Sequence, residues 1–234
     1  MKLFSIDSPF YQFMQRLWDI VKLNFMWLLF SLPVVTMGAG TIAAFSVCLK
    51  MSEDREGRIA HEFVKAFKAN WKQGIPMSFI TLICFFAAYY DFQIYNALTE
   101  NSLPFLLLGV FAVYIFTLSL IYAFPLLARY ENTVLNSLIN SFKLGMRYFG
   151  RTLILAFIVA IECVIIFWNL TTMFVGLLIG PACIIFTISG VAMHIFRDME
   201  TIPGTTANNP ADFDDYEGGM SGVDEPNDDD NEIE

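Results

Sequence analysis

One carboxylate lies deep within an apolar run of this chain. Glu162 is the eleventh residue of the run 152–168, which holds no other Asp or Glu and no Lys, Arg or His. A carboxylate in such surroundings relays a proton or contacts a substrate, or it is protonated and hydrogen-bonded to a neighbouring helix. No obvious basic partner lies within the other apolar runs. Glu162 is therefore the candidate polar site, and both interpretations stay open.

Basic side chains form a stripe at helical spacing along residues 58–73. The stripe consists of Arg58, His61, Lys65, Lys68 and Lys72. Apolar side chains lie on the opposite face, which predicts an amphipathic helix. Such a helix lies on an anionic membrane surface, where each basic residue contributes about 1 kcal/mol, or it docks a cytoplasmic partner. We do not expect a nucleic-acid partner, because the opposite face and the flanking segments are apolar.

No other residues have the spacing of a catalytic or metal site. The four cysteines are far apart in sequence and lie in or beside apolar runs, which is typical of small buried side chains. The chain lacks the HExxH, GxSxG, Walker and GxGxxG motifs,. We therefore expect neither enzyme activity nor a cofactor.

The composition indicates a membrane protein. Hydrophobic residues make up 56% of the chain and charged residues 16%, which is less charge than a soluble domain carries. Four long apolar runs, at 23–49, 73–90, 101–128 and 163–193, each reach the ~18 residues that mark a candidate membrane span. The sequence thus predicts an all-α, polytopic membrane protein.

Amphipathic and apolar segments alternate through residues 1–199. We expect amphipathic helices at 9–22, 58–73 and 132–150, and apolar helices at 23–32, 41–51, 75–95, 103–128, 152–168 and 173–196. Short matches among 21–27, 67–73 and 142–148 indicate a threefold repeat, and convergence of interfacial helices on one pattern explains them equally well. The expected arrangement is five or six membrane helices in three hairpins, each preceded by an amphipathic interfacial helix.

Basic residues occur in alternate connections of this arrangement. Lys50–Lys72 holds six Lys or Arg and Arg129–Arg151 holds four, whereas 91–102 and 169–172 hold none. The positive-inside rule makes the two basic segments and both termini cytoplasmic, in a cell membrane. A bilayer with an anionic inner leaflet is therefore an expected partner.

The first apolar run is interrupted near its middle. Its interrupting residues are Pro33, Thr36, Gly38 and Gly40. We expect 33–40 to be the turn of a first hairpin, with a single kinked span over 23–49 as the alternative. At 1.5 Å per residue, the preceding apolar helix crosses only about half a bilayer unless the amphipathic helix before it continues into it. Non-helical backbone at that depth must be buried in protein or line a wet cavity.

The C-terminal residues differ from the rest of the chain. Residues 200–234 contain twelve Asp or Glu and no Lys or Arg, whereas the preceding residues carry a net charge of +3. The segment is rich in Gly, Pro and Asn and poor in large aliphatic residues, which predicts a disordered acidic tail. We expect this tail to keep the protein soluble. Binding of a metal ion or of a partner protein is the alternative.

The interrupted run also carries a resemblance. LNFMWLLFSLPVVTMGAGTIAAF at Leu23–Phe45, followed by AFKANWKQG at Ala66–Gly74, resembles the YesL-like family of bacterial membrane proteins. The resemblance covers roughly 10–200 and is most specific at Asn24–Gly40. It implies a protein without an established activity, since the family has none.

The resemblance also implies a physiological setting. Members of the family are often encoded beside carbohydrate ABC transporters and glycoside hydrolases. This association implies an accessory or regulatory role in sugar uptake, with a carbohydrate ABC permease as partner. The alternative function is that of a small secondary transporter or channel.

Overall fold

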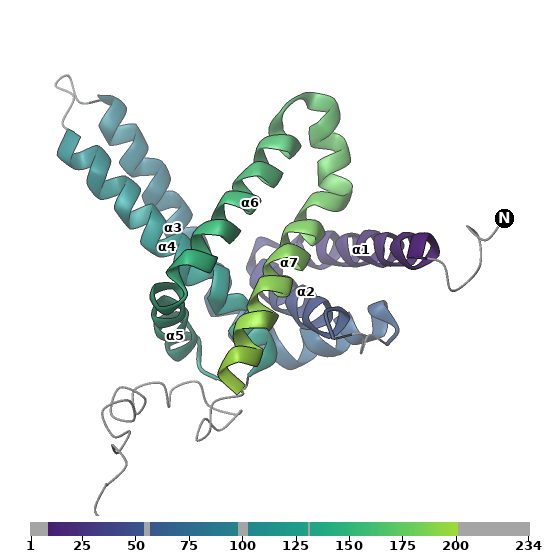
Figure 1. Ribbon diagram of the computed structural model, residues 1–234. Helices are drawn as coiled ribbons and strands as arrows, with labels where there is room; N and C mark the ends of the chain where they lie inside the picture. Colours follow the sequence, from purple (N-terminus) through teal and green to yellow (C-terminus); the bar gives the residue numbers. More distant parts are fainter. Residues whose placement is uncertain (1–8, 54–56, 98–102, 131, 201–234) are drawn as a thin grey trace, which may run out of the picture.

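The computed structural model describes residues 9–53, 57–97, 103–130 and 132–200, which form helices joined by short connections (Figure 1). These residues include no β-strand. The prediction of an all-α fold is confirmed. The acidic tail beyond Glu200 lies outside the described residues.

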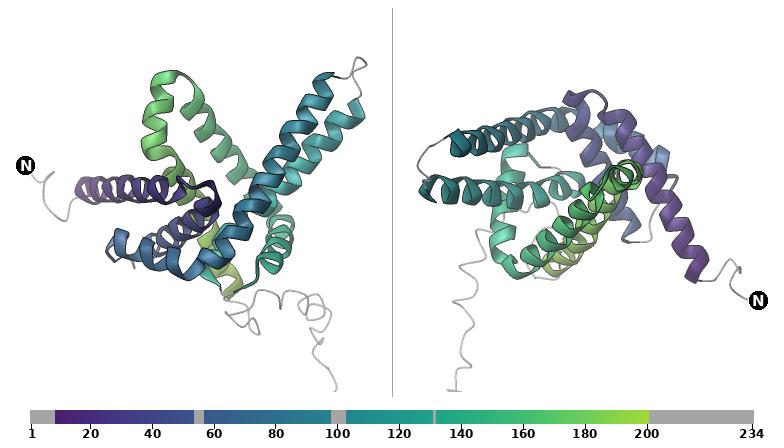
Figure 2. Two further views of the ribbon diagram at one scale, coloured as in Figure 1. Left: turned by 180° about the vertical axis from the view of Figure 1, so that it is seen from behind. Right: turned by 90° about the horizontal axis from the view of Figure 1, so that it is seen from above.

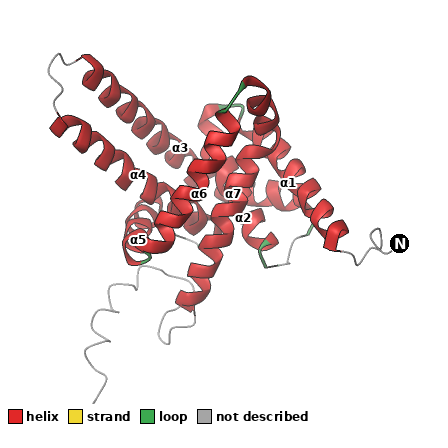
Figure 3. Ribbon diagram, turned by 45° about the horizontal axis from the view of Figure 1, so that its top comes forward, coloured by secondary structure: helices red, strands yellow, loops and turns green. Residues whose placement is uncertain are grey.

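The described chain forms seven α-helices and one turn of 3₁₀ helix. In order they are α1 (Pro9–Ser31), η1 (Val34–Thr36), α2 (Met37–Met51), α3 (Ile59–Ala97), α4 (Leu103–Arg129), α5 (Val134–Arg147), α6 (Phe149–Phe167) and α7 (Leu170–Glu200). Two hairpins, α3–α4 and α6–α7, project from a common base in different directions (Figures 1 and 2). Short turns join α1 to α2 and α6 to α7 (Figure 3).

Much of this helical surface suits lipid. Within the described residues, four segments are long and apolar enough to cross a membrane: Val34–Met51, Ile59–Tyr95, Phe149–Phe167 and Leu170–Met199. The outer parts of α3 and α6 expose large apolar side chains, such as Ile83 at 65% and Phe157 at 66%. Contiguous apolar surface of this kind marks contact with a membrane or with another protein.

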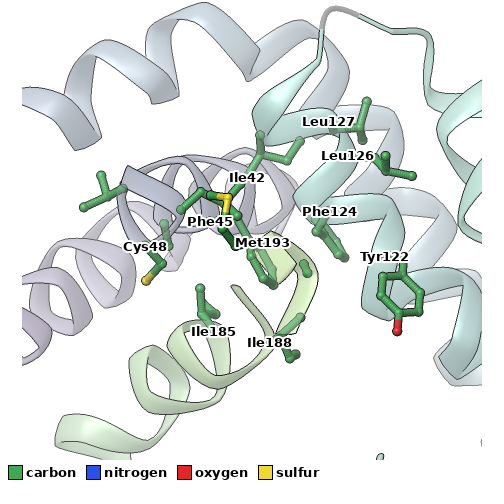
Figure 4. Packing of buried hydrophobic residues seen from close by; sticks show 14 of the residues in the cluster. Ile42, Phe45, Cys48, Tyr122, Phe124, Leu126, Leu127, Ile185, Ile188 and Met193 are labelled. Atoms are coloured by element: carbon green, nitrogen blue, oxygen red, sulfur yellow. The ribbon is translucent and has the colours of Figure 1, made fainter. Parts of the chain in front are cut away.

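Helix α2 forms the centre of the molecule. Eleven of its fifteen residues are buried, and it packs most extensively against α3 and also against α1, α4 and α7. Figure 4 shows Phe45 of α2 among Phe124 of α4 and Ile185 and Met193 of α7. A helix that is apolar on all sides is one that other helices surround, and α2 has this composition.

Two of the three expected amphipathic helices are not separate elements. Helix α1 is continuous through Pro9–Ser31, and α3 is continuous through Ile59–Ala97 with Pro76 inside it. The boundaries expected at residues 22 and 73 therefore lie inside continuous helices and are not helix ends. Proline removes one helical hydrogen bond and bends a helix that packing holds together. In Figure 2 the first part of α3 runs along the base and the remainder projects with α4.

The third junction does contain a break. Helix α5 ends at Arg147 and α6 begins at Phe149, because Tyr148 between them has φ −105° and ψ 37°, outside helical geometry. Helix α6 thus begins three residues before the expected residue 152.

Helix α5 presents its apolar face outward. Leu135, Ile139 and Met146 are 69%, 55% and 56% exposed, whereas Ser137 and Asn140 are buried against the rest of the protein. This arrangement is the reverse of a helix on a water-soluble core. It is the one expected of a helix whose outer neighbour is lipid.

Candidate functional site

The residues that interrupt the first apolar run form a tight reversal between α1 and α2. The Thr36 hydroxyl lies 2.8 Å from the Phe30 carbonyl oxygen and 2.9 Å from that of Pro33, and either can accept its hydrogen bond. Trp27 Nε1 donates across the reversal to Thr41 Oγ1 at 3.1 Å. The two helices are therefore antiparallel beside the turn. This geometry is that of a hairpin and not of a single kinked span.

The reversal is shorter than the expected turn at 33–40. Pro33 and Thr36 belong to it, but Gly38 and Gly40 lie inside α2. The prediction that these two glycines belong to the turn is wrong. A Cβ on Gly40 would lie 2.9 Å from Ser31 Oγ of α1, so this glycine permits close helix packing.

Gly38 lies where the backbones of α2 and α3 approach closely. A Cβ on Gly38 would lie 2.3 Å from the Gly74 carbonyl oxygen, and one on Gly74 would lie 2.3 Å from Ala39 Cα. The Gly38 N–H donates to Ser78 Oγ at 2.6 Å, and the Ser78 hydroxyl donates to the Gly74 carbonyl at 3.0 Å. The first N–H groups of a helix have no partner within it, and Ser78 satisfies one of them here.

This contact lies far from the end of α3. Ser78 precedes the last residue of α3 by nineteen positions, which is about 28 Å of helix at 1.5 Å per residue. The α1–α2 turn therefore ends well short of the tip of the α3–α4 hairpin. Leu32 and Val34 in the turn are 77% and 56% exposed, so the turn presents apolar side chains outward while Thr36 satisfies its carbonyl groups.

Asn24 connects α1 to α7 and is fully buried, with 0% of its surface exposed. Its Nδ2 donates to the Leu177 carbonyl oxygen at 2.9 Å, and its Oδ1 accepts from the Ala182 N–H at 3.1 Å. Pro181 explains the first contact. Proline has no N–H, so the carbonyl four residues earlier, that of Leu177, loses its helical donor. Asn24 supplies that donor, as the absence of water within a membrane requires.

Glu162 lies on α6 and is hydrogen-bonded to α7. The Thr187 hydroxyl donates to Glu162 Oε1 at 2.7 Å. The other carboxylate oxygen, Oε2, is buried and has no hydrogen-bond partner in the part of the chain that the structure describes. A neighbouring helix thus supplies one hydrogen bond, and Oε2 stays available to a proton or a ligand.

A pocket of ≈ 500 Å³ opens beside Glu162 between α6 and α7. Its walls are mainly aliphatic, with the hydroxyl-bearing Thr171 and Thr172 at one end of the hairpin. Ile165 and Val175 line it and are 60% and 56% exposed. The pocket therefore opens at the side of the hairpin, and Glu162 contributes the one carboxylate in its lining.

The basic stripe is an exposed surface at the start of α3, and we call it the basic face. Its residues are Arg58, His61, Lys65, Lys68 and Lys72, and all five are exposed. The opposite side of the helix is packed on protein. Phe63 is fully buried, and the Phe30 ring of α1 contacts the rings of Phe63 and Phe67 edge-on, with centroids 5.4 and 4.8 Å apart.

This packing bears on the two roles expected of the segment, which are contact with an anionic membrane surface and docking of a cytoplasmic partner. An interfacial helix buries its apolar face in the lipid boundary, whereas the apolar face here contacts α1 and α2. The basic face is accordingly the outward polar side of a helix fixed to the protein core. Among the described residues, no carboxylate lies within 4 Å of the charged groups of Arg58, Lys65, Lys68 or Lys72.

Ion pairs fix the base of the molecule beside this face. Lys50 at the end of α2 pairs with Glu62 of α3. Arg129 at the end of α4 lies 3.3 Å from the Glu53 carboxylate and 3.2 Å from Met193 Sδ of α7. Its guanidinium also lies 5.7 Å from the centre of the Phe196 ring. The ends of α2 and α4 and the last turns of α7 therefore meet at one place.

These features define an all-α membrane protein in which helical hairpins surround one central helix. The family model described as "Protein of unknown function, DUF624" matches residues 20–92. The matched segment includes Asn24, the contact between Gly38 and Gly74, and the basic face. No curated protein and no solved structure matches the chain. The match is compatible with the YesL-like resemblance, which stays an expectation.

The sequence analysis does not single out Ser78 or Thr187, and it includes Asn24 only within the segment that resembles the YesL-like family. Asn24, Ser78 and Thr187 each satisfy a polar group on another helix. For Asn24 the sequence does hold two signals, which are a lone amide in the apolar run 23–49 and a proline, Pro181, in the run 163–193. Nothing in the sequence pairs Asn24 with Pro181, however, because they are more than 150 residues apart.

Proposed function

We propose that this protein is a non-enzymatic component of the cell membrane that assists or regulates carbohydrate import by an ABC-type permease. The basic face is its docking surface for the cytoplasmic part of that partner. The observation that carries the proposal is the orientation of the face. Four of its basic residues are exposed and have no carboxylate within 4 Å in the described chain, on a helix whose other side is packed on the core.

Two further features support this proposal. The DUF624 match covers the segment that bears the basic face, and the YesL-like resemblance implies a setting beside carbohydrate ABC transporters. Surfaces of one charge steer a partner of opposite charge and fix its orientation. The orientation that supports the proposal places the base of the molecule and both termini in the cytoplasm.

The docking proposal predicts that charge reversal on the basic face abolishes partner binding. Lys65, Lys68 and Lys72 are changed together to Glu, and we expect severalfold less permease to co-purify in mild detergent. The matched control changes the same three residues to Arg, which keeps the charge and should retain binding. The proposal fails if wild-type protein captures no permease and its deletion leaves sugar uptake unchanged. It also fails if the Glu variant captures as much permease as the wild type.

A second candidate function is that of a small secondary transporter. The observation that favours it is the Glu162 pocket, where one carboxylate oxygen has no hydrogen-bond partner within the described residues. Intramembrane carboxylates of transporters bind protons or substrates. Helix α7, which faces the pocket, also contains a proline, Pro181, within its length.

The transporter candidate predicts that Glu162→Gln abolishes sugar or proton flux in proteoliposomes. Glutamine keeps the size of the side chain and can accept the hydrogen bond from Thr187, but it cannot bind and release a proton. Asp91→Asn, a neutralised carboxylate elsewhere in a candidate span, is the control and should leave flux intact. Equal flux through wild type and Glu162→Gln would remove the main support for this function.

A further inference from the structure

Only one carboxylate of the described chain lies close to the basic face, that of Glu62, whose Oε1 is 3.8 Å from His61 Nδ1. Arg58, Lys65, Lys68 and Lys72 carry four positive charges and have no carboxylate within 4 Å among the residues that the structure describes. The same chain holds a large excess of negative charge elsewhere, since residues 200–234 contain twelve Asp or Glu and no Lys or Arg. The two segments are therefore complementary in charge.

The structure brings the beginning of the acidic segment to the base of α3. Helix α7 ends at Glu200, seven residues after Met193. Met193 and Glu53 are joined through Arg129, whose Nη1 lies 3.2 and 3.3 Å from their side chains. Glu53 precedes Arg58 by five residues, which span at most roughly 18 Å. The acidic segment therefore starts from the same end of the molecule that carries the basic face (Figure 1).

The chain beyond Glu200 is long enough to cover that face. It contains 34 residues, and a flexible chain of this length has a root-mean-square span of about 30 Å. The basic face extends over about 21 Å from Arg58 to Lys72 at 1.5 Å per residue. The acidic groups at 212–217 and 224–234 are spaced so that both can lie within this range.

We infer that the acidic residues of 201–234 occupy the basic face of their own chain. The contact is electrostatic and reversible, so the tail competes with any acidic partner for the same surface. The tail thereby acts as an intramolecular inhibitor of docking, and this regulatory role rests on the proposed function. The contact itself does not depend on a permease, because both surfaces belong to this chain.

Carbodiimide cross-linking of the full-length protein tests the contact. The reagent joins a carboxylate to an amine only where the two already touch. In nanodiscs of zwitterionic lipid at low salt, we expect mass spectrometry to find Lys65, Lys68 or Lys72 joined to Asp or Glu of 212–234. Lys22 on α1 serves as the internal control and should not be joined to the tail. In 1 M NaCl, where the Debye length is about 3 Å, the yield should fall severalfold.

Three outcomes would overturn the inference. One is the absence of these cross-links while the tail carboxylates still couple to added glycine ethyl ester. Another is their appearance only in cross-linked dimers, which would place the tail on a second copy. The last is their loss when phosphatidylglycerol is included in the nanodisc, which would make anionic lipid the occupant of the face.

A second measurement separates this inference from the proposed function. In a full-length variant, the Asp and Glu residues of 201–234 are changed to Asn and Gln. We expect this variant to capture severalfold more permease than the wild type. If cross-links form but neither protein captures permease, the docking function fails and the tail contact stands. If both capture permease equally and no cross-links form, the tail inference fails and the docking function stands.

Discussion

Gly74→Ala is expected to destabilise the protein by about 1–3 kcal/mol, although alanine favours helices. The added Cβ would lie 2.3 Å from Ala39 Cα, and the backbone of α2 cannot rotate away as a side chain can. Helices α2 and α3 must therefore separate, which is the overpacking cost of a close-packed core. The helical preference of alanine over glycine offsets about 1 kcal/mol at most. The thermal midpoint in detergent should fall by about 2–4 °C per kcal/mol lost.

Gly190→Ala is the matched control for this prediction. A Cβ on Gly190 of α7 would have nothing within 4 Å apart from its own helix and chain neighbours. The same substitution should therefore be neutral or should stabilise the protein by up to about 1 kcal/mol. Equal midpoints for Gly74→Ala and Gly190→Ala would contradict the close backbone contact between α2 and α3.

Asn24→Ala is expected to cost about 2–6 kcal/mol, because it leaves two buried backbone groups without partners. The Leu177 carbonyl loses its donor and the Ala182 N–H loses its acceptor. An unsatisfied buried group costs about 1–3 kcal/mol, and water is scarce at this depth. Thermal unfolding in detergent measures the loss. Asn140→Ala removes a buried amide whose Nδ2 has no partner among the described residues, so it should cost less.

A double substitution tests the link between Asn24 and Pro181. Pro181→Ala restores an N–H that can donate to the Leu177 carbonyl within α7. The Asn24→Ala/Pro181→Ala protein should therefore be more stable than Asn24→Ala alone, with a coupling energy of about 0.5–3 kcal/mol. Additive effects of the two substitutions would show that Asn24 does not replace the N–H group that Pro181 lacks.

Several features of the fold follow from local sequence properties. The helical class, the apolar runs and the outward basic stripe could each be predicted because periodicity and composition act within a few turns. The boundaries at residues 22 and 73 could not be predicted. A change from amphipathic to apolar composition reports a change of surroundings, and α1 and α3 pass through both without a break in hydrogen bonding.

In the candidate sites, too, the local features could be predicted from the sequence and the contacts between helices could not. Glu162 was found from its sequence context alone, since a carboxylate in an apolar run is rare. Its donor, Thr187, and the pocket depend on how α6 crosses α7. The sequence predicts that Gly38 and Gly40 belong to a turn, whereas both lie inside α2. Their real neighbours are the backbone of α3 and the Ser31 side chain, which the sequence does not place beside them.

The sequence by itself determined that this is an all-α membrane protein with one basic helical face and an acidic C-terminal segment. Composition, charge and spacing are local properties, so they show which face of a helix is apolar and which is polar. Only the tertiary structure decided that the apolar side of the basic helix packs on protein, and that Asn24 bonds to the backbone of α7 beside Pro181. Those contacts join residues up to 158 positions apart, and they depend on the shapes of whole packed helices.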